Sequence, residues 1–123
     1  STAYQHNNKL LYIDKLIIPL PYDFDMSGFI NPSYAVVNET LNIANIRQRK
    51  YRGFKRDEDV FYKVRDIFIE KKSDMLSLIK SFEADFDNES EYEEAIEYIE
   101  SFFDIIEDDK KFTDNVVLAA RTK

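Results

Sequence analysis

The chain has 123 residues and a formal net charge of −7, with 44% hydrophobic and 15% aromatic residues. This length suits one modest domain with a real core, and the composition is unlike that of disordered chains. Cysteine is absent and His6 is the only histidine, which excludes disulfides, thiol catalysis and zinc sites built from several Cys or His ligands.

The first predicted element is a β-hairpin within residues 9–22. An apolar run ends at Ile13, a turn is expected near Asp14-Lys15, and a second run covers 16–22. Prolines 19 and 21 indicate that pairing of the second strand is interrupted. The hairpin should deliver Asp23 and Asp25 into the loop that follows.

Asp23 and Asp25 lie one residue apart at the end of an apolar run, so they can grip a hard cation. Mg²⁺ prefers oxygen ligands and is commonly held by one or two carboxylates plus substrate phosphates. The alternative is a plain surface turn, because Asp, Ser and Gly all favour turns. Spacing alone leaves both interpretations open.

After an irregular stretch, a short helix is predicted from about Asn42 to Tyr51, within a basic part of the chain. Residues 47–56 contribute +6, whereas residues 57–109 hold 19 acidic and five basic side chains, a net charge of −14. This acidic flank would repel nucleic acid within a Debye length of about 8 Å, so we expect no nucleic-acid binding. We expect Arg47, Arg49 and Arg52 either to hold one small phosphate or to pair with the acidic helices.

The two glycines, Gly28 and Gly53, are expected to take backbone conformations that other residues avoid.

From Asp57 the apolar period is helical. The first stripe, expected to be core, is Phe61, Val64, Phe68, Met75, Leu78 and Phe82. Lys71 interrupts it, so the run from Lys71 to Asp74 either divides two helices, with Ser73 as a cap, or lies in one helix with Lys71 reaching solvent.

A second helix is predicted after the capping-box spacing of Ser90 and Glu93. Its apolar stripe is Ile96, Ile99, Phe103 and Ile106. A last helix from about Lys110 to Arg121 offers Phe112, Val116 and Ala119. We expect these stripes to be core as well, because a helix gains stability mainly by packing its apolar face.

The residues from Ile18 to Gly28 resemble the Pro-Trp-Asp-x-Asp-x-Ser motif of the CotH spore-coat kinase family, a branch of the atypical protein-kinase-like fold. The segment from His6 to Leu11 is similar to the Asn-containing segment that precedes that motif by a strand pair, and residues 47–54 extend the resemblance. It covers roughly residues 6 to 56. The helical remainder looks like a kinase C-lobe only in a general way.

The resemblance implies a metal site. Asn7 would match the metal-binding Asn of the kinase catalytic loop, Asp23 the Asp of the Asp-Phe-Gly motif, and Asp25 a second carboxylate near the same cation. The resemblance then also implies that the site binds Mg²⁺ or Mn²⁺ together with ATP and that the phosphoryl group passes to an acceptor that is unknown. The family's catalytic Asp would lie upstream of Ser1, and a glycine-rich loop and a nucleotide-binding Lys are missing. We therefore expect the C-terminal part of a longer chain, inactive by itself.

The sequence thus predicts one mostly α-helical domain over residues 1–123, with a small hairpin near the N-terminus and a helical part like a kinase C-lobe. The hairpin and metal loop occupy residues 6–30 and the helical part residues 42–121. The competing hypothesis is a non-catalytic interaction module whose acidic helices dock a protein partner. We expect a soluble chain, since it shows no signal sequence and no apolar run near the roughly 20 residues of a membrane span. The compartment is not indicated.

Overall fold

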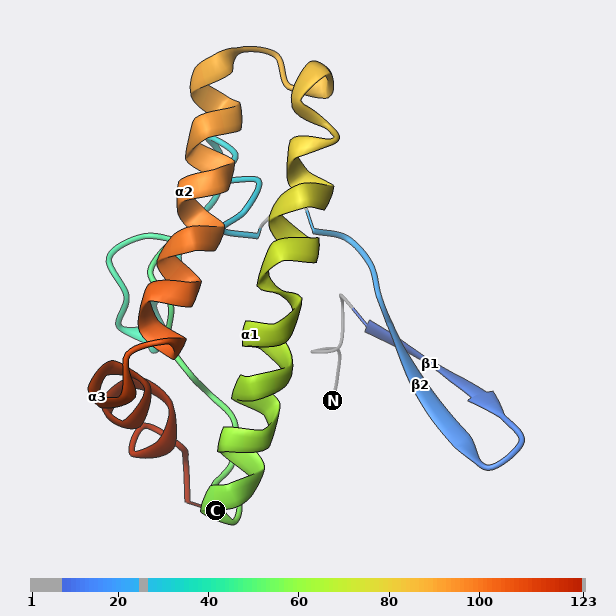
Figure 1. Cartoon of the computed structure of the whole chain (residues 1–123), viewed down its shortest axis with the longest axis vertical. Helices are drawn as coiled ribbons and strands as arrows, with labels where there is room; N and C mark the ends of the chain where they lie inside the picture. The colour runs from blue at the N-terminus through green and yellow to red at the C-terminus, as the bar shows by residue number, and fades with distance from the viewer. Residues whose placement is uncertain (1–7, 25–26, 123) are drawn as a thin grey trace.

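A computed structural model describes residues 8–24 and 27–122 (Figure 1). Two long antiparallel helices, α1 (Glu58–Lys80) and α2 (Glu89–Ile106), lie side by side, and the short helix α3 (Asp109–Phe112) follows at their lower end. The strands β1 (Asn8–Ile13) and β2 (Leu16–Pro21) form an antiparallel hairpin that projects to one side. The predicted fold class, mostly α with a small hairpin near the N-terminus, is confirmed. The likeness to a kinase C-lobe stays a prediction.

Helix α1 runs without a break through the segment from Lys71 to Asp74, so the one-helix alternative is correct. Lys71 is exposed there and pairs with Asp74 at 3.4 Å. Glu58 and Asp59 begin the helix and Lys80 ends it, an arrangement that complements the helix dipole.

Helix α2 begins two residues before the predicted capping box. Asn88 is the N-cap, with extended backbone, and its Oδ1 accepts the backbone N–H of Glu91 at 3.0 Å. Its Nδ2 also donates to Glu91 Oε1 at 3.1 Å, a contact between side chains in place of the backbone N–H contact of a full capping box. The three-residue spacing was correct, but Asn88 and Glu91 fill it instead of Ser90 and Glu93.

The core lies where α1, α2 and α3 meet. Its buried apolar side chains are Phe61, Phe103, Ile106 and Phe112, and Ala95 is buried separately, nearer the start of α2. The stripe predicted for α2 is confirmed, with Phe103 fully buried. The stripe predicted for α1 is wrong beyond Phe61 and the half-buried Met75. Its remaining members are 40–61% exposed: Val64, Phe68, Leu78 and Phe82.

Two basic residues explain the orientation of α1. Arg65 and Lys72 are half-buried on the inner side of the helix, next to Tyr62 and Ile69. Arg65 Nη1 lies 2.7 Å from Asp109 and Lys72 Nζ lies 2.8 Å from Glu107, at the corner between α2 and α3. These ion pairs turn the predicted apolar stripe outward, while the aliphatic stems stay against the core.

The last predicted helix is shorter and of mixed type. Asp108 caps α3 by accepting the backbone N–H of Lys111 at 2.8 Å, and a π-helical turn, η3 (Thr113–Val117), follows. Arg121 then leaves the helical path and bridges to Phe54, with its N–H donating to the carbonyl of Gly53 at 2.9 Å. This bridge ends the helix before Arg121 and fixes the chain just ahead of α1.

The helix predicted from Asn42 to Tyr51 does not form. A short 3-10 helix, η1 (Glu39–Leu41), comes before this stretch, which is built of turns. Asn45 Oδ1 accepts the backbone N–H groups of Arg47 and Gln48, each at 3.0 Å. Asn45 thus caps a single turn, closed by the N–H of Gln48 donating to the carbonyl of Asn45 at 3.2 Å, and the chain does not continue from it into a helix.

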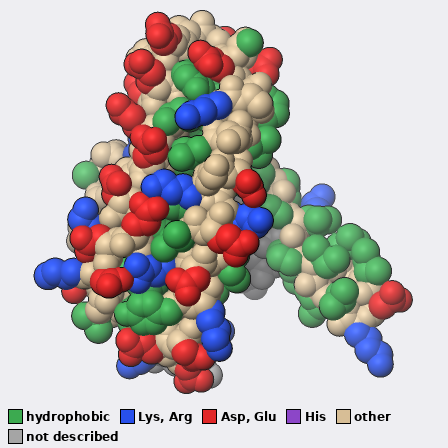
Figure 2. All heavy atoms as spheres, viewed as in Figure 1, with side chains coloured by type: hydrophobic (Ala, Val, Ile, Leu, Met, Phe, Trp, Pro, Cys, Tyr) green, Lys and Arg blue, Asp and Glu red, His purple; other side chains and the backbone are tan. Residues whose placement is uncertain are grey.

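The hairpin stands apart from the helical core. Its register pairs Ile13 with Leu16 across the two-residue turn, and Asp14 takes a φ of 46°. Residues 9–22 are all exposed. Figure 2 shows hydrophobic side chains covering the hairpin, whereas acidic side chains are scattered over the helices.

Prolines 19 and 21 occupy one edge of the hairpin. The pair that flanks a two-residue turn is hydrogen-bonded, and bonded pairs then alternate along the ladder. Pro19, opposite Leu10, and Pro21, opposite Asn8, therefore fall at positions whose N–H would point outward. The prediction of interrupted pairing is wrong for the β1–β2 ladder, because the missing donors belong to the outer edge of β2.

Candidate functional site

The metal loop predicted from the sequence is described only in part. Asn7 and Asp25 lie outside the described residues. Asp23 is exposed, two residues beyond the last strand pair, Asn8 with Pro21. Within residues 8–24 and 27–122, no three His, Cys, Asp or Glu side chains gather closely enough to hold a metal ion.

The backbone at Asp23 is left-handed, with a φ of 62°. Asp tolerates this region better than most residues, but a non-glycine residue there still costs of order 1 kcal/mol. Such conformations cluster at ligand-binding and catalytic positions. The left-handed residue turns the chain sharply as it leaves β2.

The loop after Asp23 is fixed to α2 by close approach. A Cβ placed on Gly28 would lie 2.5 Å from Tyr98 Oη and 2.6 Å from the carbonyl oxygen of Ile46. Phe29 packs against the Tyr98 ring with 6.5 Å between centroids. Neither Gly28 nor Gly53 has a positive φ, so the expectation of unusual backbone was wrong. Glycine is required at position 28 because there is no space for a Cβ.

Two of the three predicted phosphate-binding arginines are engaged with α2. Arg47 lies 3.2 Å from Glu94. Arg49 Nη1 donates to Ser101 Oγ at 2.8 Å, and its Nη2 donates to the carbonyl of Tyr98. Burial lowers the pKa of Arg49, and the charge of Tyr98 opposes that change. Arg52 is exposed. These contacts favour internal pairing over phosphate binding for Arg47 and Arg49.

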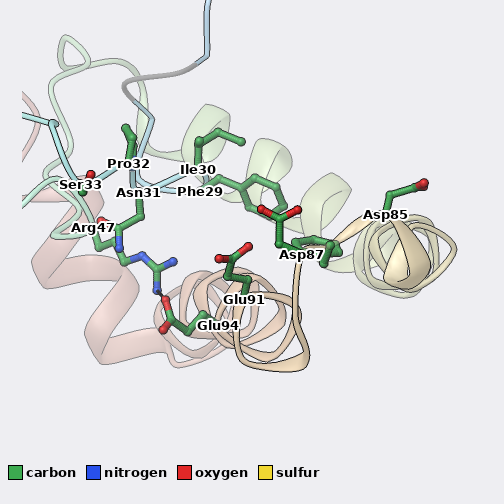
Figure 3. A pocket seen from close by; sticks show the side chains of 11 residues that line it. Phe29, Ile30, Asn31, Pro32, Ser33, Arg47, Asp85, Asp87, Glu91 and Glu94 are labelled. Atoms are coloured by element: carbon green, nitrogen blue, oxygen red, sulfur yellow. Dashed lines mark ion pairs between the residues drawn. The ribbon is translucent and has the colours of Figure 1, made fainter.

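A hollow of about 630 Å³ opens between residues 29–33 and the start of α2 (Figure 3). Aromatic and apolar side chains, Phe29, Ile30, Pro32 and Phe86, form part of its lining. The charged residues that line it are Arg47, Asp85, Asp87, Glu91 and Glu94. Glu94 is paired with Arg47 and Asp85 points away from the other acids (Figure 3), so Asp87 and Glu91 are the carboxylates that make this hollow attractive to cationic groups.

Sequence reasoning did not single out these acids as a site and missed the hollow. In Figure 3, Asp87 and Glu91 lie close together and Arg47 reaches Glu94, while Asp85 points away from them. The lining comes from three segments that are far apart in the chain, and no local motif joins them. Only the folding of residues 29–33 onto α2 brings them together.

The chain matches no protein-family model, no curated protein and no solved structure at a significant level. Among the described residues, no helix combines the length and the apolar character needed to cross a bilayer. A function is therefore proposed from the chemistry of the side chains rather than from related proteins.

Proposed function

We propose that this chain supplies divalent-metal ligands for nucleotide phosphates in a kinase-like phosphoryl transfer. The observation that carries the proposal is the placement of Asp23, an exposed carboxylate on a left-handed residue just past a paired strand. The resemblance of residues 18–28 to the CotH motif adds Asp25, and that of residues 6–11 adds Asn7. Catalysis would need the nucleotide-clamping parts that this sequence lacks.

The donor chemistry fits the proposed ion. Asp23, Asp25 and Asn7 offer only oxygen to a metal, and oxygen is the ligand that Mg²⁺ and Mn²⁺ prefer. A bound divalent ion neutralises charge on the transferring phosphate. The chain's own part is to place Asp23 just beyond a hairpin whose two strands are in fixed register.

The test is a titration with Mn²⁺ and with Mg²⁺, followed by tyrosine fluorescence and, for Mn²⁺, by the loss of the free-ion EPR signal. Tyr22, next to Asp23, is a natural reporter. Asp23→Asn and Asp25→Asn should each abolish binding. Asp14→Asn is the matched control, because Asp14 is also exposed and left-handed but sits at the opposite end of the hairpin. Absence of binding at millimolar metal, or equal loss in the control, contradicts the proposal.

A second candidate is a non-catalytic module that binds a basic segment of a partner protein. The acidic hollow favours it, since its aromatic rings and carboxylates suit the stem and the charged head of Lys or Arg. A labelled Arg-rich peptide should bind with an affinity that falls as salt rises. Asp87→Asn with Glu91→Gln should weaken binding, whereas Glu100→Gln, elsewhere on α2, should not. Equal binding by all variants would argue against the hollow.

A further inference from the structure

Two apolar surfaces of this chain are exposed. The first is the hairpin surface, 38–68% exposed at each residue: Leu10, Leu11, Tyr12, Ile13, Leu16, Ile17, Ile18, Leu20 and Tyr22. The second is the α1 stripe, 40–61% exposed: Val60, Val64, Ile67, Phe68 and Leu78. Both lie outside the core described above.

The hairpin surface has the composition of strands that are covered on both faces. Leu10, Tyr12 and Ile17 lie on one face, and Leu11 and Ile18 on the other, so hydrophobic and polar residues do not alternate. An isolated two-stranded hairpin is at best marginally stable in water. Its nine exposed side chains present on the order of 800 Å² of apolar area, above the few hundred Å² usual for a monomer.

A shallow apolar groove adjoins the α1 stripe. It has a volume of about 200 Å³, and its lining includes Val60, Val64 and Phe68 of the stripe. The core residues Phe61 and Phe112 form its floor. A sheet face can therefore lay apolar side chains onto the stripe and into the groove.

We infer that a second copy of this chain covers both surfaces, with the hairpin of each copy packed on the α1 stripe of the other. Each copy supplies one hairpin and one stripe, so a two-fold dimer forms two equal contacts. Each contact covers one face of the hairpin, about half of its apolar area, so the two contacts together bury on the order of 1,600 Å², the size of a standard stable interface.

The charge distribution permits this pairing and disfavours one other way to join two copies. Helix α1 carries five acidic and five basic side chains, so it does not repel a hairpin that carries Lys9 and Lys15 against Asp14. Helix α2 carries seven acidic side chains and no basic one, so a contact between two α2 helices would bring two acidic surfaces together. The dimer uses neither Asp23 nor Asp25, so its test is independent of the test of the metal proposal.

The experiment is sedimentation velocity from micromolar to submillimolar protein, on the wild type and three variants. Ile17→Asp alters the hairpin surface at a residue that is 61% exposed, and Ile67→Asp alters the stripe at one that is 59% exposed. Each should weaken dimerisation by about tenfold or more, because a charge is forced into an apolar contact. Val36→Asp is the control, since Val36 is 77% exposed and lies outside both surfaces. It should remain as dimeric as the wild type.

Mixing the two interface variants decides which surfaces meet. A mixed pair combines the intact hairpin of the Ile67→Asp copy with the intact stripe of the Ile17→Asp copy, so one of the two contacts is restored. The equimolar mixture should therefore form heterodimers although each variant alone is monomeric. Far-UV circular dichroism should match the wild type, and Leu16→Asp with Val64→Asp provides a second pair if either variant misfolds.

Three results would overturn the inference. The first is a wild type that stays monomeric throughout the concentration range, as it would if the hairpin folded onto its own α1. The second is a mixture that stays monomeric, which would mean that the hairpin of one copy does not meet the stripe of the other. The third is an Ile17→Asp variant that dimerises as well as the wild type.

Discussion

The guanidinium of Arg49 lies 3.9 Å from the ring centroid of Tyr98, which is 49 residues later in the chain. The same guanidinium donates to the carbonyl of Tyr98 and to Ser101 Oγ. Through these contacts the irregular segment before α1 is joined to the middle of α2. The proposed metal loop is held to the same tyrosine through Gly28 and Phe29, so Tyr98 links the loop, the arginine and the helix.

Replacing Arg49 should loosen this junction. Arg49→Ala removes a stacked, forked donor and should lower the free energy of unfolding by about 1–3 kcal/mol. Arg49→Lys should recover only part of the loss, because an ammonium keeps the charge but not the planar fork. Urea unfolding measures both. Arg52→Ala is the control at an exposed arginine, and an equal loss there would contradict the argument.

Phe103 should be the most costly aromatic residue to truncate. It is 0% exposed at the centre of the core, so Phe103→Ala should destabilise the fold by about 3–5 kcal/mol through lost burial and the cavity left behind. Phe82→Ala tests the same chemistry at a residue that is 51% exposed and should cost far less. Similar unfolding midpoints for the two variants would place the core elsewhere.

Gly28→Ala should destabilise the protein by about 1–3 kcal/mol, because its Cβ would overlap the backbone oxygen of Ile46 as well as Tyr98. Gly53→Ala is the comparison. The nearest atoms to a Cβ added there belong to the side chain of Tyr51, which is 36% exposed and can move aside more easily than backbone. The midpoint temperature of thermal unfolding should therefore be well below that of Gly53→Ala for the Gly28→Ala variant. The reverse order would show that the loop is not packed against Tyr98 as described.

Asp108 should give the protein an acid-sensitive contribution to stability. Its hydrogen bond from the backbone N–H of Lys111 lowers the pKa of Asp108 in the folded state. The carboxylate therefore stabilises the fold above the unfolded-state pKa of about 3.9, and this contribution is lost as the pH falls through the lower folded-state pKa.

Asp108→Asn retains a capping side chain but cannot titrate, so its urea midpoint should fall less steeply with acid than that of the wild type. The measurement is the urea midpoint as a function of pH, from neutral conditions to below the unfolded-state value. Glu100→Gln is the exposed control on α2. Parallel curves for Asp108→Asn and the wild type would contradict the role of this cap.

Much of the fold followed from local patterns. The turn at Asp14-Lys15 and the apolar run on each side of it predicted the hairpin, and the period of the α2 stripe predicted its buried side. The orientation of α1 could not be predicted in this way. It depends on partners of Arg65 and Lys72 that lie 35 or more residues away, and no local period contains them.

The remaining errors have similar causes. The helix predicted at residues 42–51 is only a single turn capped by Asn45, and the apolar pattern did not show that the helix stops there. For the site, the apolar run correctly placed Asp23 just beyond a strand, and its roles with Asn7 and Asp25 stay predictions. The acidic hollow is assembled from distant segments, so only the tertiary fold places its carboxylates together.

The two prolines of β2 also limit how far this chain can assemble. With no N–H at Pro19 or Pro21, the outer side of β2 is a poor template for another strand, whereas the outer side of β1 keeps its donors. A ribbon that can grow from one side only cannot propagate into a fibril by repeated strand addition. An exposed and strongly apolar hairpin is thereby protected from open-ended polymerisation, and contact through its main chain stops at a single neighbour.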